Sequence, residues 1–386
     1  MSLFPNEEAR RAAFPVVQQG IFLAHAGVTV LPRCAADAMS AHAEASCLRH
    51  QEFGDVLRDV TKTRGLCARV IGADPDEIAL LGPTSLGLSL FANGIAWEEG
   101  DEVICYGDDY PSNVYPWAAL ASRGVVVKYL EPEIPGDITP ELLAEYLTPR
   151  TKLVALASCH FLSGRRIDVD AIGCLLHERG VLFSLDAIQT VGAAPLSVAH
   201  VDFLSADAHK WMLGPLAIGI VYVAKRHFEI CRPTLLGAWN VKSPDFIAQR
   251  EIVFEPTARR YEPGVLNITG MYGMKASLGM LEETGLENVE RAILNARDHL
   301  ESCLREAGFE FLSPAADDPL RSGILTARHP SKPAAEIFSA LEEEGITASL
   351  RMIRSGQQWI RFSPHFYNTI EEMNRVADVL RRKINA

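Results

Sequence analysis

The sequence lacks several features that would place it in common functional classes. No apolar run reaches the roughly 18–20 residues of a membrane-spanning helix, and the segment from Met1 to Arg11 has mixed charges without the apolar core of a signal peptide. With 37 Lys and Arg against 49 Asp and Glu, the net charge is −12, so no basic stripe is expected to neutralise nucleic-acid phosphates. The nucleotide-binding patterns G-x-G-x-x-G and G-x-x-x-x-G-K-[ST] are also missing. These absences disfavour a membrane protein, a nucleic-acid binder and a nucleotide-binding α/β protein.

Cysteine is present but in no pattern that binds metal. The eight cysteines form no C-x-x-C pair and do not cluster with histidines. A zinc site needs closely spaced Cys and His ligands, and a disulfide framework is typical of short secreted chains. The spread over 386 residues therefore predicts reduced, mostly buried thiols in a cytoplasmic protein without a metal site.

Short apolar runs alternate with amphipathic segments between residues 76 and 223. This alternation predicts a mostly parallel sheet covered by helices on both faces, an α/β fold. The runs lack polar alternation, as strands do when both of their faces are buried. The expected strands are Glu77–Leu81, Glu102–Cys105, Val125–Tyr129, Lys152–Ala157, Val181–Asp186, Asp202–Ala206 and Ile218–Val223. The expected helices between them include Thr84–Ala96, Asn113–Arg123 and Asp168–Arg179.

The pattern changes after about residue 275, where a long helix is followed by mixed strands and helices. A chain of 386 residues exceeds what one core usually fills, so two domains are expected. We expect an N-terminal segment (1–30) that packs near the active site, a large cofactor-binding domain (31–270) and a smaller C-terminal α+β domain (271–386).

Two charged residues stand just beyond strand ends. Asp186 ends one apolar run, and Lys210 follows the next one in the segment Asp207–Trp211. A carboxylate facing a pyridinium nitrogen and a lysine that forms a Schiff base are the protein groups that pyridoxal 5'-phosphate (PLP) chemistry needs. We therefore interpret Lys210 as the cofactor lysine, catalytic together with Asp186. The simpler alternative is a solvated lysine and a helix-capping aspartate.

An anion site is predicted where a strand passes into a helix at Gly82-Pro83-Thr84-Ser85. Backbone N–H groups at a helix start, with the hydroxyls of Thr84 and Ser85 beside them, suit a phosphate, although a plain N-cap is the alternative. His209 is expected to donate to the same phosphate. Asp207 would repel a phosphate unless it bonds elsewhere, and we expect it to orient His209.

Further candidates surround this pair. Gln189 is placed to hydrogen-bond the ring's phenolic oxygen, and Tyr110 to stack on the ring, unless each is only a loop residue. Arg361 lies in an apolar strand, where a buried guanidinium needs a planar anion such as an amino-acid carboxylate; the alternative is an internal salt bridge.

The pocket is also expected to include residues that face the substrate. His25 and Arg351 are candidate substrate-binding residues, with His160, Trp239 and Arg354 as further lining groups. The two arginines of this set hint at a second acidic group on the substrate.

Taken together, four stretches resemble the class V aminotransferase superfamily of fold-type I PLP enzymes. The likeness covers nearly the whole chain. It rests on Phe22–Val28, on the D-x-x-Q segment Ser184–Thr190, on the H-K-W and G-P pattern from Ala208 to Pro215, and on the segment Arg361–Thr369, which resembles "R-x-S-x-x-x-Y-N-T".

The resemblance implies a fold and a set of roles. The fold is a large domain with a mostly parallel seven-stranded sheet plus a small C-terminal domain. Lys210 carries the cofactor, Asp186 pairs with the ring nitrogen, and Arg361 takes the substrate carboxylate. The family is dimeric, and the segment Tyr261–Asn267 would lie near the partner's phosphate site, with Val265 where many relatives have Thr.

Departures from the family pattern narrow the reaction. Cysteine desulfurases carry a nucleophilic Cys before the C-terminal Arg, whereas Ser349–Gln358 contains none, so no thiol would accept sulfur there. Phe161 stands where desulfurases tend to have Asn. The His-Lys-Trp sequence resembles the isopenicillin-N-epimerase-like and lyase-like branch. The expected reaction is therefore transamination of an α-amino acid, with epimerisation or β-elimination as alternatives and PLP binding without turnover ranked below them.

Overall fold

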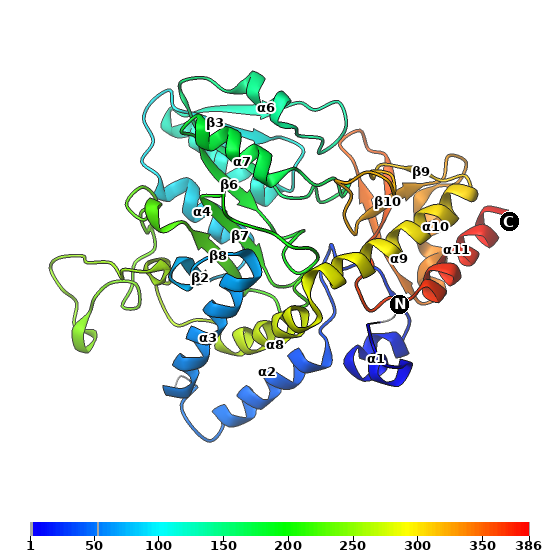
Figure 1. Cartoon of the computed structure of the whole chain (residues 1–386), viewed down its shortest axis with the longest axis horizontal. Coiled ribbons are helices and arrows are strands. Elements are labelled where there is room, and N and C mark those ends of the chain that lie inside the picture. The colour runs from blue at the N-terminus through cyan, green and yellow to red at the C-terminus, as the bar shows by residue number, and fades with distance from the viewer. Residues whose placement is uncertain (1–2, 52–53, 386) are drawn as a thin grey trace.

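The computed structural model describes residues 3–51 and 54–385, which build two sheets with helices packed around them (Figure 1). The larger sheet has seven strands in the order β2-β8-β7-β6-β5-β3-β4. Its strands β3 to β7 are parallel to their neighbours, and β8 is antiparallel to both β2 and β7. The strands are β2 (Ile78–Leu80), β3 (Glu102–Tyr106), β4 (Val126–Leu130), β5 (Thr151–Ala157), β6 (Leu182–Asp186), β7 (Phe203–Asp207) and β8 (Gly219–Val223). Each lies where the sequence predicts a strand, so the predicted mostly parallel α/β sheet is confirmed.

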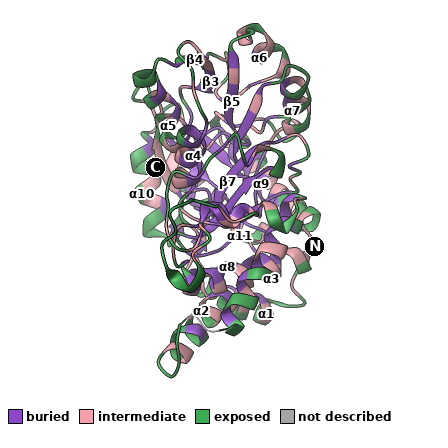
Figure 2. Ribbon diagram, turned by 90° about the vertical axis from the view of Figure 1, so that its left-hand side faces the viewer, coloured by how far each residue is buried: buried purple, intermediate pink, exposed green. Residues whose placement is uncertain are grey.

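Both faces of this sheet are covered, as its unbroken apolar strands predict. Ile104 and Val154 belong to one hydrophobic core, and their neighbours Val103 and Leu153 to another. Successive side chains of a strand point to opposite faces, so the sheet separates two cores. Figure 2 shows the buried residues concentrated along these central strands. The helices of this unit include α4 (Thr84–Gly94), α6 (Pro140–Tyr146) and α7 (Val169–Glu178).

Helices that the sequence pattern did not single out complete the large unit. They are α2 (Arg33–Ser46), α3 (Gly54–Ile71) and α8 (Ile268–Thr284), and α8 packs against both others. The expected helix Asn113–Arg123 is instead broken into the short α5 (Tyr115–Ala118) and flanking 3-10 turns. Pro116 occupies its first turn, and Gly124 ends the segment with a φ of 81°. These residues favour short turns over a continuous helix.

The smaller sheet has four antiparallel strands in the order β12-β13-β10-β9. They are β9 (Glu310–Phe311), β10 (Leu325–Arg328), β12 (Ser349–Met352) and β13 (Gln358–Phe362), covered by α9 (Leu286–Glu306), α10 (Ala334–Glu343) and α11 (Ile370–Asn385). This is the α+β arrangement expected for the C-terminal part.

The N-terminal segment joins this smaller unit. After α1 (Glu7–Ala13), strand β1 (Ile21–Phe22) pairs in parallel with β11 (Ile346–Thr347), and Ala24 bridges to Ser363. The chain then runs past the carboxyl edge of the large sheet. The segment therefore lies between the two sheets, which agrees with our proposed three-part division.

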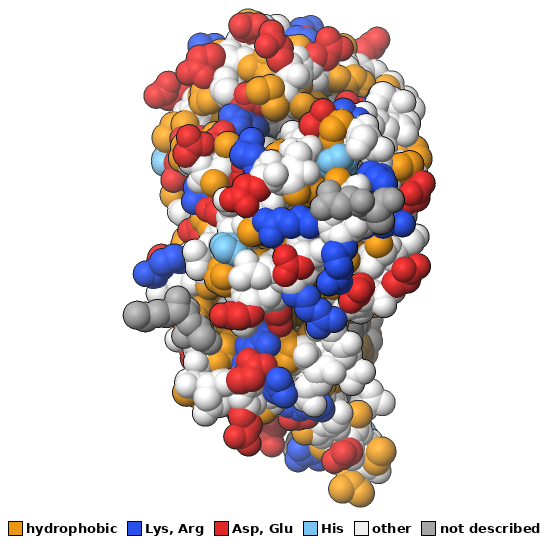
Figure 3. Space-filling model, turned by 90° about the vertical axis from the view of Figure 1, so that its right-hand side faces the viewer, with side chains coloured by type: hydrophobic (Ala, Val, Ile, Leu, Met, Phe, Trp, Pro, Cys, Tyr) orange, Lys and Arg blue, Asp and Glu red, His pale blue; other side chains and the backbone are white. Residues whose placement is uncertain are grey.

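The face of the molecule shown in Figure 3 carries basic and acidic side chains interspersed. No extended surface of one charge is visible on it. Within the described ranges, we find no helix with the length and apolar character that a membrane crossing requires.

Candidate active site

Asp186 and Lys210 meet because two neighbouring parallel strands end at the same edge of the sheet. Asp186 is the last residue of β6, which pairs with β7 so that Asp186 lies opposite Ser205. Strand β7 ends at Asp207, and the following turn carries Lys210. In open α/β sheets this carboxyl edge is where ligands bind.

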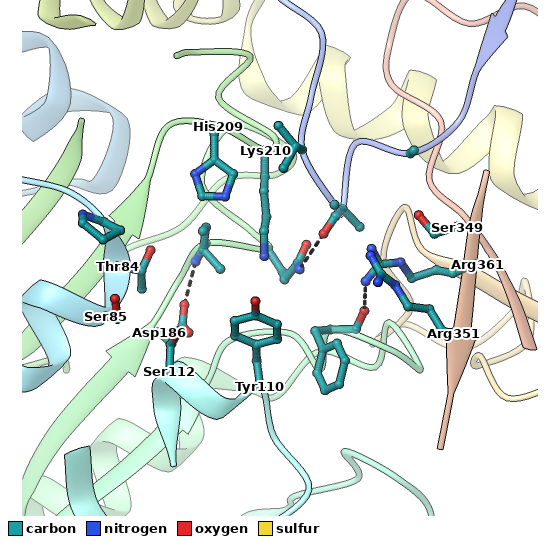
Figure 4. A pocket seen from close by; sticks show the side chains of 18 residues that line it. Thr84, Ser85, Tyr110, Ser112, Asp186, His209, Lys210, Ser349, Arg351 and Arg361 are labelled. Atoms are coloured by element: carbon teal, nitrogen blue, oxygen red, sulfur yellow. Dashed lines mark hydrogen bonds between the residues drawn. The ribbon is translucent and has the colours of Figure 1, made fainter. Parts of the chain in front are cut away.

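A cavity of about 490 Å³ opens at this edge (Figure 4). Its size lies within the range of small-molecule and cofactor sites. All of the predicted site residues except Asp207 and His25 line it: Thr84, Ser85, Tyr110, Asp186, Gln189, His209, Lys210, Arg351 and Arg361. Figure 4 shows Thr84, Ser85 and His209 on one side of Lys210, and the two arginines on the other.

The start of α4 forms one end of the cavity. Pro83 precedes the helix and makes no side-chain cap, and Thr84 Oγ1 accepts a hydrogen bond from the Asp207 N–H at 2.9 Å. A β-carbon on Gly87 would lie 2.4 Å from Ser205 Oγ, so glycine allows α4 to pack directly on β7. The helix start is thereby held at the strand ends, in reach of an anion.

His209 is oriented by the carboxylate that seemed out of place beside a phosphate. Asp207 Oδ2 lies 2.6 Å from His209 Nδ1, and Asp207 Oδ1 accepts from the Ala208 N–H at 3.0 Å. The carboxylate is therefore occupied within its own turn, and His209 keeps Nε2 for the cavity. This geometry supports the orienting role expected for Asp207.

Burial shifts the pKa values of the charged pair. Burial raises the pKa of Asp186, and the neighbouring Asp109 carboxylate raises it further. Burial lowers the pKa of Lys210, an effect that Asp186 opposes and that Arg361 and Arg351 strengthen. The Lys210 amine thus loses its proton more readily than an exposed lysine, which suits a base near neutral pH.

Gln189 is fixed by a residue to which the sequence pattern assigns no role. Trp211 Nε1 donates to Gln189 Oε1 at 2.8 Å, so the amide nitrogen is turned the other way, where Nε2 donates to Ala26 O at 3.2 Å. An amide nitrogen has two N–H groups. The second remains for a ligand in the cavity.

Tyr110 contributes an aromatic face. Its ring centroid lies 5.2 Å from Lys210 Nζ and 5.5 Å from the Phe161 ring centroid, with an interplanar angle of 71°. The phenol is 46% exposed, so the ring is not merely core packing.

Arg361 forms the opposite end of the cavity. It is buried, and its Nη1 donates to Phe161 O at 2.6 Å. Its Nε and Nη2 have no hydrogen-bond partner among the described residues, and the internal salt bridge considered as an alternative is not seen there. Burial, together with Arg351, lowers the pKa of Arg361 to about 9, as expected for a guanidinium that waits for an external anion.

Three candidates lie away from the cavity lining. His25 is fully buried, with Nδ1 donating to Ser363 O at 2.9 Å and Nε2 accepting from Tyr367 OH at 3.0 Å. Both ring nitrogens are used, so the structure does not bring His25 to a substrate. His160 bonds Ser163 and the Asp108 backbone, and Arg354 is ion-paired with Asp108. The expected substrate contact of His25 is replaced by a structural role.

Other residues of the site were not assigned from the sequence. Asp109 is buried, and its pKa is raised to about 6 mainly by burial. Its place after β3, at the same edge as Asp186, was the signal that could have found it. Ser112 and Ser349 line the cavity, but a serine in a loop or strand carries no such signal.

The residues present fit PLP. An uncapped helix start with hydroxyls suits its phosphate, and Asp186 and Lys210 are the carboxylate and amine that its ring and aldehyde require. Unpartnered buried nitrogens on Arg361 suit the carboxylate of an amino acid. The fold and this site define a PLP-dependent enzyme of fold-type I.

The chain belongs to the class V aminotransferase family, whose model matches residues 21–376. Among curated relatives, "Probable cysteine desulfurase" of Pyrococcus abyssi is 26% identical, covering 97% of this chain and 97% of its own. "Uncharacterized aminotransferase YcbU" of Bacillus subtilis is 25% identical, covering 97% of this chain and 98% of its own. The family resemblance read from the motifs is therefore confirmed.

Solved structures support the fold. The apo cysteine desulfurase from Thermococcus onnurineus NA1 superposes with a TM-score of 0.90 at 22% identity, covering 100% of both chains. The cystine C-S lyase C-DES, in complex with its reaction product cysteine persulfide, gives a TM-score of 0.86 at 22% identity, covering 95% of this chain and 99% of its own. At these identities the likeness establishes the architecture.

Proposed function

We propose that this enzyme acts on an α-amino acid, with Lys210 as its proton-transferring base and transamination as its reaction. The observation that carries the proposal is the place of Lys210, between an anion site at the start of α4 and the unpartnered guanidinium of Arg361. When bound, PLP supplies an electron-withdrawing ring to which the substrate amine is joined.

The cavity would divide its residues between cofactor and substrate. Thr84, Ser85 and His209 would hold the phosphate, and Asp186 would face the ring nitrogen. These contacts fix the ring by its two ends.

The remaining contacts would set the electronics and the pose. Gln189 would donate its free N–H to the phenolic oxygen, and Tyr110 would cover the ring. Arg361 would bind the α-carboxylate through Nε and Nη2, which is the bidentate geometry of an arginine fork. Held in this way, the α-proton of the substrate would face Lys210.

Proton transfer would rest on the lowered pKa of Lys210. Burial favours its neutral amine, which can take the α-proton and return it on the same side of the substrate. Epimerisation requires a second acid on the opposite side, and the cavity lining offers Tyr110 as the other hydroxyl acid of the ring's surroundings. A single amine base supports transamination.

Sulfur transfer to a protein thiol is not supported. None of the described cysteines lines the cavity, and Cys159 is buried with its pKa raised to about 11 by burial. Relatives are named as desulfurases, but a persulfide needs a reactive thiolate close to the substrate.

The test uses the purified holoenzyme and the variant Lys210→Ala. We expect the variant to lose the visible absorbance of the lysine-bound cofactor and to exchange substrate α-protons in D2O about 10²–10⁴-fold more slowly. The exposed Lys225 provides the control variant, Lys225→Ala. Absorbance and exchange that survive in Lys210→Ala would overturn the assignment.

An amino-acid panel then separates the reactions. A keto acid formed at the expense of a second keto acid supports transamination, whereas the enantiomer or ammonia identifies epimerisation or β-elimination. A holoenzyme that exchanges no α-proton with any amino acid would show that the chain binds PLP without turnover.

A further inference from the structure

Two arginines enter the cavity from neighbouring strands of the small sheet. Strands β12 and β13 pair so that Ser349 lies opposite Arg361, and Arg351 lies two residues beyond Ser349 on the same strand. Directly opposed residues share a face of a sheet, as do residues two apart. Ser349, Arg351 and Arg361 therefore point to the same side, and all three line the cavity (Figure 4).

The two guanidinium groups end at the same place. The Nη2 atoms of Arg351 and Arg361 each lie 3.6 Å from the point that a β-carbon on Gly27 would occupy. Both side chains thus converge on the N-terminal segment where it crosses the cavity. Two like charges at such close range repel, and Arg351 contributes to the lowered pKa of Arg361.

No protein anion balances this pair within the described part of the chain. Neither arginine forms an ion pair there, and Nε of both, with Nη2 of Arg361, lacks a hydrogen-bond partner. Asp186, the carboxylate among the described lining residues, lies at the far side of Lys210. An α-carboxylate would neutralise one of the two guanidinium charges and leave the other.

We propose that the substrate is an acidic amino acid, whose α-carboxylate is bound by Arg361 and whose side-chain acid is bound by Arg351 with Ser349 beside it. The proposal rests on the proposed function and names the class of substrate for that site. A guanidinium fork matches an oxyanion of this kind.

The structure separates Arg351 from the other arginine of the same loop region. Arg354 is exposed and forms an ion pair with Asp108, and it also donates to Gly107 O at 3.0 Å. It lies outside the cavity lining. Arg354 is therefore the matched control for Arg351.

The experiment measures binding to the holoenzyme. L-aspartate is compared with L-asparagine, and L-glutamate with L-glutamine, by the change in visible absorbance of the bound cofactor. Succinate and glutarate, which have no amine and cannot react, are compared with propionate and butyrate by calorimetry. We expect at least one acidic amino acid to bind at least tenfold more tightly than its amide, and one dicarboxylate more tightly than its monocarboxylate.

Variants assign the preference to Arg351. Arg351→Gln should bring the acid and its amide within threefold of one another while binding of the amide changes little. Arg351→Lys, which keeps the charge, should retain part of the preference, and Arg354→Gln should retain all of it. Unchanged cofactor absorbance in each variant checks that the site is still folded.

Two outcomes would overturn the proposal. Equal binding of acids and amides by the unmodified enzyme is one. The other is an Arg351→Gln variant that weakens all amino acids alike, because both arginines would then hold the α-carboxylate. If dicarboxylates bind through Arg351 but no amino acid perturbs the cofactor, the anion pair stands and the proposed function fails.

Discussion

Single residues of the site are held by buried neutral groups. His365 is fully buried, its Nε2 donates to Trp211 O at 3.0 Å, and its Nδ1 accepts from the Phe366 N–H at 2.9 Å. These partners fix one neutral tautomer. Burial lowers the pKa of His365 to about 4. Since Trp211 in turn orients Gln189, the histidine supports the cavity from behind.

Acid should therefore destabilise the fold through His365. Its pKa is about 4 in the folded chain and about 6.5 when unfolded, so between these values the unfolded state binds more protons and stability falls as the pH falls. This contribution amounts to about 2 kcal/mol by pH 4.5. We expect His365→Gln, which stays neutral, to lose about 2 kcal/mol less free energy of unfolding than the unmodified protein between pH 7.5 and 4.5. Urea denaturation at several pH values measures this difference.

Other buried groups titrate in the same window, and they are common to both proteins. His160 has its pKa lowered to about 4 and Asp109 has its pKa raised to about 6, mainly by burial in each case. The difference between the two proteins therefore isolates His365. Parallel stability curves would contradict a neutral buried histidine.

The sequence predicted those site residues whose position follows from a strand end or a helix start. Asp186, Lys210 and Thr84 stand at such places, and the structure brings them to one cavity. His25 was misplaced because its partners Ser363 and Tyr367 come from the other end of the chain. Contacts of that kind depend on how the small sheet docks, which no local pattern records.

At the scale of elements, the anion end of the cavity depends on how closely α4 approaches the sheet. A β-carbon on Gly87 would meet the Ser205 side chain at 2.4 Å and the Val221 side chain at 2.9 Å. Both are buried residues of β7 and β8, so neither can move freely. The glycine is therefore required by packing, since it costs helix stability elsewhere.

Gly87→Ala should push α4 away from the sheet. We expect a loss of about 1–3 kcal/mol in the free energy of unfolding, as for overpacked cores, and easier release of the cofactor on dialysis because the helix start moves. Gly279→Ala is the matched control, since Gly279 lies within α8 and a β-carbon added there would have no neighbour within 4 Å. It should gain up to about 1 kcal/mol from helix propensity. Equal gains from both substitutions would contradict the tight contact.

Elements were predicted where periodicity was local. All seven strands of the large sheet were found because their apolar runs are short and bounded by turns. Helices α2 and α8 are rich in Ala, Gly and Met, so their apolar face is not marked by large residues and depends on their mutual packing. The expected helix at 113–123 failed because helical propensity was counted across Pro116.

At the scale of the whole molecule, one exposed apolar surface is unexplained by a single chain. Between β8 and α8 the chain projects from the large sheet (Figure 1). Its exposed apolar side chains are Leu235, Leu236, Phe246, Ile247, Ile252, Val253 and Val265. A cluster of this kind is typical of an interaction surface. Together with the family's dimeric habit, it supports a homodimer in which the segment 261–267 lies near the partner's phosphate site.

Sedimentation should therefore show a dimer of the 42.3 kDa chain. Val265 is 65% exposed in the single chain, so Val265→Glu should not disturb the fold of the subunit but would bury a charge in the interface. We expect this variant to dissociate at concentrations where the unmodified enzyme is dimeric, and to retain PLP less well because each site loses the partner's segment. Ile134→Glu, an equally drastic change at a residue 52% exposed between β4 and α6, should leave both properties unchanged. A monomeric enzyme that keeps PLP fully would show that one chain completes the site alone, whereas a dimer unaffected by Val265→Glu would place the interface on another surface.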